Sequence, residues 1–160
     1  MNVKKSGYTL IEVLVGLTII GLIFSFGFVS FRDFARRQAL ASAARALRGD
    51  LRLAQGQALA GKKPSDVFCN SPNTLDGVNF RVVDPSNYTF EAGCTGGVVQ
   101  IKSVDLPSDI SISTPSPNPI LFRILGRGTN IATGDVTITL TQSSTSSTAD
   151  IVISANGEIE

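Results

Sequence analysis

The chain has 160 residues and a formal net charge of +1, and its 42% hydrophobic and 17% charged residues exclude both a disordered chain and nucleic-acid binding driven by bulk charge. It has no histidine and only two cysteines, which excludes Ser-His-Asp and Cys-His catalytic arrangements, histidine-ligated zinc sites and four-cysteine zinc sites. The length allows one modest domain, or one domain with an appended element.

The charges are distributed unevenly along the chain. Residues 1–61 carry eight basic and three acidic side chains, a net charge of +5, whereas residues 62–160 carry six basic and ten acidic ones, a net charge of −4. The acidic balance of the second part argues against nucleic acid as a partner. The two parts are therefore expected to form different kinds of structure.

A long apolar run comes first. Residues 8–31 contain one charged side chain, that of Glu12, and follow a basic leader over residues 1–7 that includes Lys4 and Lys5. As a helix, the run would be about 36 Å long and would cross a hydrocarbon core of about 30 Å. No small-residue cleavage site closes the run, which disfavours a secretory signal, while an uncleaved membrane anchor stays open.

Glu12 is the unusual residue of this run. A carboxylate in a spanning helix costs about 2.5–3.5 kcal/mol at the bilayer centre and less near an edge, and it is usually functional. Because Glu12 lies only one turn into the run, its side chain has the alternative of reaching back to the interface. The residues around Glu12 favour a functional carboxylate over a side chain that only reaches back to the interface.

Residues 4–15 read Lys-Lys-Ser-Gly-Tyr-Thr-Leu-Ile-Glu-Val-Leu-Val, which resembles the class III signal of type IV pilins and type II secretion pseudopilins. The resemblance implies that a prepilin peptidase cuts after Gly7 and N-methylates Tyr8, although most family members have Phe at that position. It also implies that Glu12 is the family's assembly glutamate. We expect its carboxylate to pair with the Tyr8 amine of a neighbouring subunit.

Helical periodicity continues beyond the apolar run. Six apolar residues at spacings of three and four form one stripe, and Gly61 followed by Pro64 predicts the helix end. One helix over residues 8–60 would be about 80 Å long, with residues 32–61 outside the membrane and a break near Gly49 left open. The stripe consists of Leu40, Ala44, Leu47, Leu51, Ala54 and Ala58.

Four arginines lie beside this stripe. Arg37, Arg45, Arg48 and Arg52 are expected on a solvated face, or in contact with acidic lipid and neighbouring subunits. Arg32 and Arg36 also follow the apolar run, so the positive-inside rule does not by itself place residues 62–160 outside the cytoplasm. The family resemblance does imply that placement.

The pattern changes to a period of two after residue 61. Short runs rich in β-branched residues alternate with turn residues, which predicts antiparallel strands packed on the helix and an α+β fold for the whole chain. Residues 141–148, rich in Ser and Thr, are expected to be a flexible hairpin loop, with a glycosylated or adhesive loop as the weaker alternative. The predicted strands are 78–83, 88–92, 98–104, 110–113, 120–125, 136–141 and 151–154.

Cys69 and Cys94 are the only cysteines. In a cytosolic domain, two unpaired thiols would be expected. In the exported β domain that the family resemblance implies, a disulfide is expected instead, which would place the domain in an oxidising compartment.

The last third of the chain indicates one branch of this family. A Phe-x-x-x-Gly turn from Phe122 to Gly126, a long strand, and a closing Ser-x-x-Gly hairpin from Ser154 to Gly157 are similar to the GspH/FimT branch of minor pilins and pseudopilins. This resemblance implies a structural subunit without enzymatic activity, metal or cofactor, which helps to initiate or cap a type IV pilus or a type II secretion pseudopilus.

The implied partners are the prepilin peptidase, other minor and major pilins or pseudopilins, the inner-membrane assembly platform and the lipid bilayer. The resemblance implies a single-pass protein of the inner membrane with the β domain outside the cytoplasm, and the tip of the pilus or pseudopilus is the implied position in the filament. The alternative function is DNA binding during natural transformation, with Arg123 and Arg127 as contacts, but the tail ends in Glu158 and Glu160. An exported enzyme is disfavoured because no two carboxylates are paired as acid and base.

Overall fold

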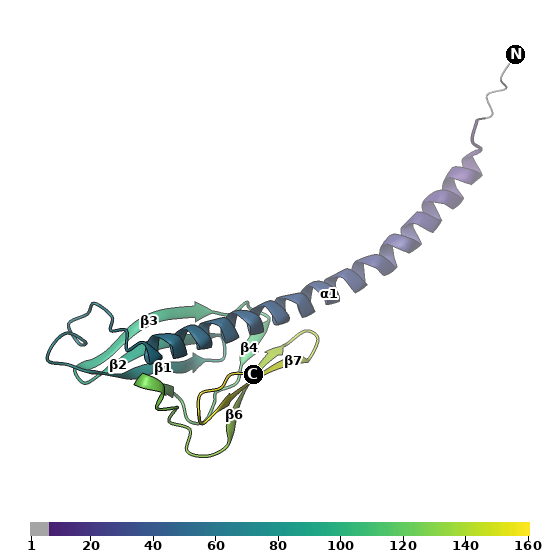
Figure 1. Cartoon of the computed structure of the whole chain (residues 1–160). Coiled ribbons are helices and arrows are strands. Elements are labelled where there is room, and N and C mark those ends of the chain that lie inside the picture. Colours follow the sequence, from purple (N-terminus) through teal and green to yellow (C-terminus); the bar gives the residue numbers. More distant parts are fainter. Residues whose placement is uncertain (1–6) are drawn as a thin grey trace, which may run out of the picture. The chain divides into compact units, whose positions relative to one another are not determined.

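The structure, a computed structural model, describes residues 7–160, without the side chains of residues 25–30. One helix precedes seven strands and one short 3-10 helix (Figure 1). The chain has two compact units, of which the first ends at Arg36 and the second comprises Arg37–Glu160. The elements are α1 (Leu10–Leu59), β1 (Leu75–Asp84), β2 (Asn87–Cys94), β3 (Gly97–Asp105), β4 (Ile110–Ile112), β5 (Ile120–Arg123), η1 (Ile124–Gly126), β6 (Asp135–Gln142) and β7 (Ser147–Ser154).

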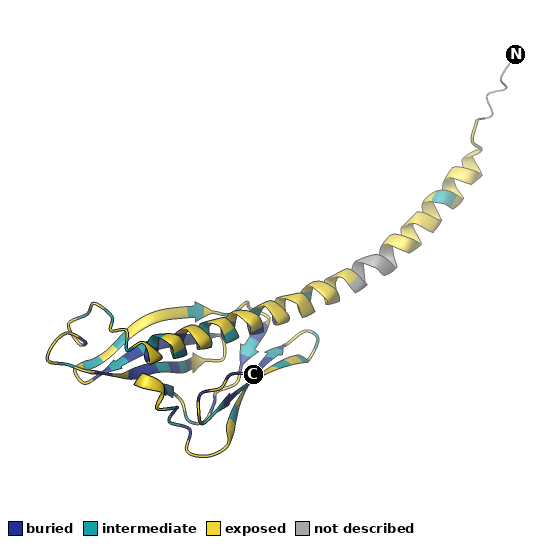
Figure 2. Ribbon diagram, in the orientation of Figure 1, coloured by how far each residue is buried: buried dark blue, intermediate teal, exposed yellow. Residues whose placement is uncertain are grey.

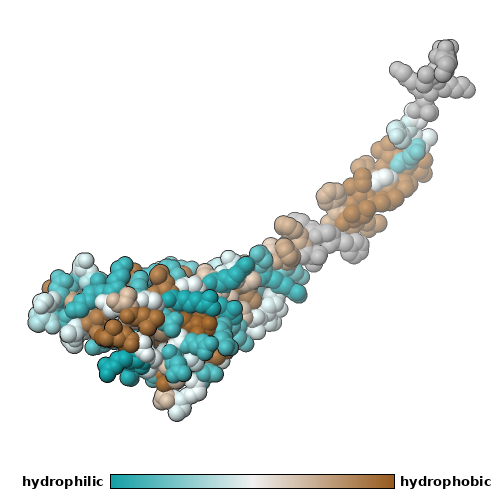
Figure 3. Space-filling view, in the orientation of Figure 1, coloured by the Kyte–Doolittle hydropathy of each residue, from teal (hydrophilic) through white to brown (hydrophobic). Residues whose placement is uncertain are grey.

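The first unit contains the N-terminal part of α1. Nearly all of its described side chains are exposed, and most are apolar (Figures 2 and 3). No helical stretch among the described residues is both long enough and apolar enough to cross a membrane. The predicted membrane span over residues 8–31 is therefore not confirmed. The side chains of residues 25–30 of this span are outside the described part of the structure. Residues 1–6 of the predicted leader are also outside the described chain.

The second unit contains the rest of α1, and here the predicted stripe is confirmed. All six of its residues are buried, and Leu47 and Leu51 are 0% exposed. The helix ends two residues before Gly61, and it runs without a break through Gly49, where a break had been left open. Apolar contacts along this face outweigh the cost of about 1 kcal/mol for a glycine inside a helix.

Seven antiparallel strands form two sheets in the same unit. One sheet has the order β3-β2-β1-β5 and the other the order β4-β6-β7. All seven predicted strands are present, but β1 begins at Leu75, three residues earlier than predicted, and β7 begins at Ser147, four residues earlier. The predicted strand over residues 120–125 is wrong at its end, because β5 stops at Arg123 and the chain turns into η1, where Leu125 has φ 56°. Gln142 pairs with Ser147, so the predicted loop over residues 141–148 is a shorter turn between β6 and β7. The α+β prediction is confirmed.

The core lies where the buried side chains of both sheets meet α1 (Figure 2). Every buried residue of the described chain lies between Leu40 and Ile159, so residues 37–160 contain the whole of this core. The largest fully buried side chains include Phe80, Tyr88 and Phe122 from one sheet and Ile138, Leu140, Ile151 and Ile153 from the other.

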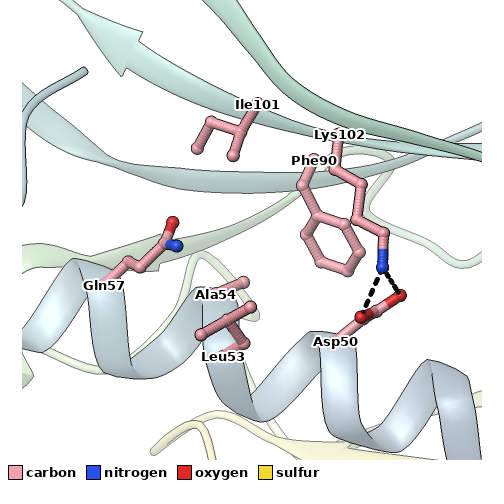
Figure 4. A pocket seen from close by; sticks show the side chains of 7 residues that line it. All are labelled: Asp50, Leu53, Ala54, Gln57, Phe90, Ile101 and Lys102. Carbon is pink, nitrogen blue, oxygen red and sulfur yellow. Dashed lines mark hydrogen bonds and ion pairs between the residues drawn. The ribbon is translucent and has the colours of Figure 1, made fainter. Parts of the chain in front are cut away.

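A polar contact joins α1 to the first sheet (Figure 4). Lys102 Nζ lies 2.7 Å from both carboxylate oxygens of Asp50, and the Tyr88 hydroxyl donates to the same carboxylate at 3.2 Å. A bulge in the β2–β3 pairing, after Phe90, leaves Ile101 without a paired residue, and Ile101 and Lys102 both line a cavity against α1. The cavity is about 30 Å³, which is room for about two water molecules.

We expect Tyr88 to make stability depend on pH in the alkaline range. Burial, with a smaller effect from Asp50, raises the pKa of the Tyr88 hydroxyl above its usual value. The unfolded chain therefore loses this proton first, and the contribution, which is complete below pH ~10, falls by about 1.4 kcal/mol per pH unit above it. The free energy of unfolding of residues 37–160, measured with urea at several pH values between 9 and 11, should fall less steeply with pH for Tyr88→Phe than for the natural sequence. Equal slopes would contradict this prediction.

The opposite side of α1 binds β7 and the segment that follows it. Arg48 Nη2 donates to the Asp150 carbonyl at 2.9 Å, and Gln55 Nε2 donates to the Gly157 carbonyl at 2.9 Å. Between them, Arg52 Nη2 lies 3.4 Å from the Ile159 carbonyl. The expected solvated or intermolecular position holds for Arg52, which stays exposed although its guanidinium also reaches a carbonyl of its own domain. It holds only in part for Arg48, which is half-buried and donates to the Asp150 carbonyl.

Candidate processing and assembly segment

Gly7, Tyr8 and Thr9 precede α1 and belong to no helix or strand. All three are exposed, and the Tyr8 side chain is 84% exposed. A Cβ added at Gly7 would meet nothing within 4 Å. Both residues that flank the Gly7–Tyr8 peptide bond are thus exposed, and the described residues leave room for a side chain at position 7.

Thr9 begins the helix that carries Glu12. The Thr9 carbonyl accepts from the backbone N–H of Glu12 at 3.1 Å and of Val13 at 3.3 Å. The Thr9 hydroxyl lies 3.5 Å from the Glu12 carboxylate, and the spacing Thr-x-x-Glu is that of a capping box. The Thr9 hydroxyl is thus a contact of Glu12 within its own chain, at the start of α1.

In the single chain, the Glu12 carboxylate has no ion-pair partner among the described residues, and the apolar side chains around it are exposed. Leu10, Ile11, Val13 and Leu14 are all more than half exposed around it. No cation of the described residues forms an ion pair with its carboxylate. The segment thus presents an apolar surface with one unpaired negative charge, which lipid or neighbouring chains would have to cover.

Cys69 and Cys94 form a disulfide, as expected, with their Cα atoms 5.3 Å apart. Both are buried, and they form a small second core with Leu75 and Ala92. The bond ties the segment between α1 and β1 to the end of β2, and Ile124 packs against the small core that contains it.

Removing the disulfide is expected to destabilise the second unit. The two cysteines are 25 residues apart, and a loop of that length corresponds to a stabilisation of about 3–4 kcal/mol from chain entropy. Thermal and urea unfolding of residues 37–160 should show this loss for the double variant Cys69→Ala/Cys94→Ala. Reduction of the natural sequence with dithiothreitol is the control, and it should reach the same stability.

The two arginines proposed for DNA contact lie in one loop. Arg123 ends β5, Arg127 follows η1, and both side chains are exposed. The backbone N–H of Arg123 donates to the Gly128 carbonyl at 2.9 Å, which closes the loop. The structure thus brings Arg123 and Arg127 together, but it adds no further basic side chain to this loop.

Two family models match the chain. The prokaryotic N-terminal methylation motif matches residues 2–28, and the type II transport protein GspH matches residues 43–157, more than half of the chain. A methylation motif ahead of a long helix, whose second half packs on an antiparallel β domain, defines a protein of the type IV pilin class. Within this class, the chain belongs to the GspH family, which is structural rather than enzymatic. Searches of curated proteins and of solved structures found no match.

Two groups of contacts were not predicted from the sequence. Asp50, Lys102 and Tyr88 come together from α1, β3 and β2, and nothing in their spacing indicates it. Arg48, Arg52 and Gln55 follow one another at helical spacing beside the buried stripe. That position at the border of the apolar face was the available signal, because long polar side chains there reach over the docked surface.

Proposed function

We propose that the chain is a minor pilin or pseudopilin subunit that helps to initiate or cap a type IV pilus or a type II secretion pseudopilus. The observation that carries this proposal is the N-terminal segment, where an accessible Gly7–Tyr8 bond precedes a helix with an unpaired Glu12 among exposed apolar side chains. The match to the methylation motif over residues 2–28 supports it.

The proposed processing makes the segment competent for assembly. Cleavage after Gly7 removes the cationic leader and leaves the amine of Tyr8 at the start of the helix. Glu12 of a neighbouring subunit then pairs with that amine, so that each charge satisfies the other in an apolar surrounding. The pair also fixes how far one helix is shifted along the next.

The proposed location follows from the same segment. Before assembly, the exposed apolar side chains around Glu12 are covered by the lipid of the inner membrane, as a single-pass anchor. The β domain lies outside the cytoplasm, and the Cys69–Cys94 disulfide supports this placement because disulfides persist in oxidising compartments. The proposed partners are the prepilin peptidase, other pilins or pseudopilins and the assembly platform of that membrane.

DNA binding has less support than assembly. Arg123 and Arg127 are two cations on an acidic domain, whereas phosphate binding needs a larger basic cluster. Glu158 and Glu160 follow the Gly157 turn, which packs beside this loop.

Intact-mass spectrometry of the chain extracted from the native membrane tests the proposal. The expected product lacks residues 1–7 and carries one additional methyl group on Tyr8. Deleting the gene should also abolish secretion or pilus formation, and restoring the full-length chain should recover it. A native chain that keeps its first seven residues would overturn the proposal.

A further inference from the structure

The loop that follows β5 exposes a leucine in an unfavourable backbone conformation. Leu125 is 74% exposed and has φ 56° and ψ 33°, in the left-handed region that favours glycine. The chain has glycine at the two other left-handed positions of this loop, Gly126 at φ 71° and Gly128 at φ 75°. The leucine side chain therefore suits neither the backbone nor the core of its own domain, and residues of this kind commonly belong to binding surfaces.

A second exposed leucine lies beside this loop. Leu59, the last residue of α1, is 48% exposed, and a Cβ at Gly126 would lie 3.5 Å from the Leu59 Cδ2 atom. Figure 1 shows η1, in green, next to this end of α1. The helix end and the loop thus each contribute one exposed leucine to the same part of the domain surface.

Two arginines flank Leu125 in the sequence. Arg123 and Arg127 are exposed, and among the described residues neither of them forms an ion pair. Arg81 and Lys102, in contrast, each form an ion pair with a carboxylate of their own domain. Free guanidinium groups beside exposed apolar side chains favour a partner that offers both carboxylates and an apolar group. We use the name loop surface for Leu59, Arg123, Leu125 and Arg127.

The loop surface is held in place from two sides. The Arg127 N–H donates to the Ile124 carbonyl at 3.3 Å, and Ile124 packs against the small core that contains the disulfide. On the other side, a Cβ at Gly128 would lie 2.8 Å from the Ala155 carbonyl oxygen, so the loop lies close against the turn after β7. A surface that is already ordered loses little conformational entropy when a partner binds.

We propose that the loop surface binds a neighbouring filament subunit of different sequence, at a segment where carboxylates flank a bulky apolar side chain. The carboxylates pair with Arg123 and Arg127, and the apolar side chain packs on Leu59 and Leu125. The inference rests on the proposed function, because a subunit that initiates or caps a filament has other pilins or pseudopilins as its neighbours. It adds the place of one such contact and the chemistry of the partner.

A protein partner fits this surface better than nucleic acid does. A phosphate backbone would bind the two arginines but would gain nothing from Leu59 and Leu125. It would also come near Glu158 and Glu160, which follow the turn packed beside the loop, and the domain over residues 62–160 has a net charge of −4. A short acidic segment of a protein can reach the arginines without passing these glutamates.

Site-specific photo-cross-linking in the native membrane tests the contact. The full-length chain with p-benzoylphenylalanine in place of Leu125 should cross-link to one other chain that carries an N-terminal methylation motif. Mass spectrometry of the digest identifies the cross-linked peptide, which should contain at least two carboxylates around an apolar residue. The same photoreactive group in place of Ser144, an exposed residue of the β6–β7 turn, should not cross-link to that chain.

Charge exchange tests the pairing. Arg123→Glu/Arg127→Glu should reduce the cross-link from position 125 at least about tenfold, because carboxylates would then face carboxylates. Replacing the flanking carboxylates of the identified segment with lysine should restore the cross-link. A change in the partner cannot correct misfolding of this chain, so restoration would show charge pairing. An undiminished cross-link in the double variant would overturn the proposal.

Leu125→Gly separates binding from folding. Glycine adopts the left-handed conformation freely, so the melting temperature should stay the same or rise, whereas copurification of the identified partner with the full-length chain should fall at least about tenfold. Ser146→Gly is the matched control, because Ser146 at φ 52° is the other non-glycine residue of the described chain with a positive φ, and it should leave copurification unchanged. Loss of the partner together with a lower melting temperature in Leu125→Gly would overturn the proposal, because the leucine would then serve the fold.

The failure of this inference is distinguishable from that of the proposed function. In chains that are correctly cleaved after Gly7, cross-links only to a second copy, only to a protein without the methylation motif, or to nothing would overturn the contact and leave the filament role intact. Binding of a fluorescent DNA duplex that is lost in Arg123→Glu/Arg127→Glu but kept in Leu125→Gly would assign the arginines to nucleic acid and also overturn it. A native chain that keeps residues 1–7 would instead overturn the proposed function.

Discussion

Replacing Gly7 with valine is expected to leave residues 1–7 on the chain and to eliminate it from assembled filaments. The peptidase must bind the bond between Gly7 and Tyr8 closely, and a branched side chain at that position would prevent this. The fold offers no competing explanation, because a Cβ at Gly7 would meet nothing within 4 Å. An uncleaved chain has no free Tyr8 amine, so the predicted partner of Glu12 is missing in every subunit.

The measurement is the intact mass of the membrane-extracted chain, together with its amount in sheared filaments or in the secretion-active fraction. Gly16→Ala is a matched control on the same segment, since a Cβ at Gly16 also meets nothing within 4 Å, and it should be cleaved and assembled normally. If Gly7→Val were cleaved at the natural rate, the assignment of the processing site would be wrong.

The helix and the strands were predictable because each has a local signature. The buried stripe from Leu40 to Ala58 repeats with the helical period, and all of its members face the core. In β1, Val78, Phe80 and Val82 alternate with less buried residues, which is the pattern of a strand with one face in the core. Periodicity of this kind depends on neighbouring residues only, so it can be read from the sequence.

Contacts between distant residues were not predictable in the same way. Asp50 and Lys102 are 52 residues apart, and Lys102 comes near Asp50 through a bulge that no local pattern indicates. Arg48 reaches a carbonyl 102 residues away. A charged side chain at the border of a helix face fits solvent, lipid or a docked segment equally well, and only the topology of the second sheet decides among them.

The same distinction between local patterns and contacts of distant residues applies to the candidate site. The Gly7–Tyr8 bond and Glu12 could be proposed from the sequence because the motif is contiguous, and the pairing of Glu12 with a second chain stays a prediction. In the loop after β5, the sequence indicated only two arginines, Arg123 and Arg127. What the structure adds is Leu125 between them, in a left-handed conformation for which the sequence, with leucine at that position, offers no signal.

Replacing Glu12 with glutamine is expected to leave cleavage and methylation intact while reducing assembly by at least about 100-fold. Glutamine keeps the size and the helix but removes the charge, so the amine of a neighbouring Tyr8 is left without its anion in an apolar surrounding. Breaking one partner of a buried ion pair costs about 3–5 kcal/mol, which corresponds to a decrease of this size or larger. The amounts of mature chain in the membrane and in filaments are the two quantities to compare.

Thr9→Ala separates the two roles of Glu12. If the carboxylate acts only at the start of α1, where the Thr9 hydroxyl lies 3.5 Å from it, both substitutions should reduce helix stability by about 1 kcal/mol and affect assembly equally. If the carboxylate pairs with the amine of another chain, Thr9→Ala should assemble nearly as well as the natural sequence, and Glu12→Gln should not. Equal and small effects of the two variants would assign Glu12 to the helix start alone, because an intermolecular ion pair cannot survive the loss of its only anion.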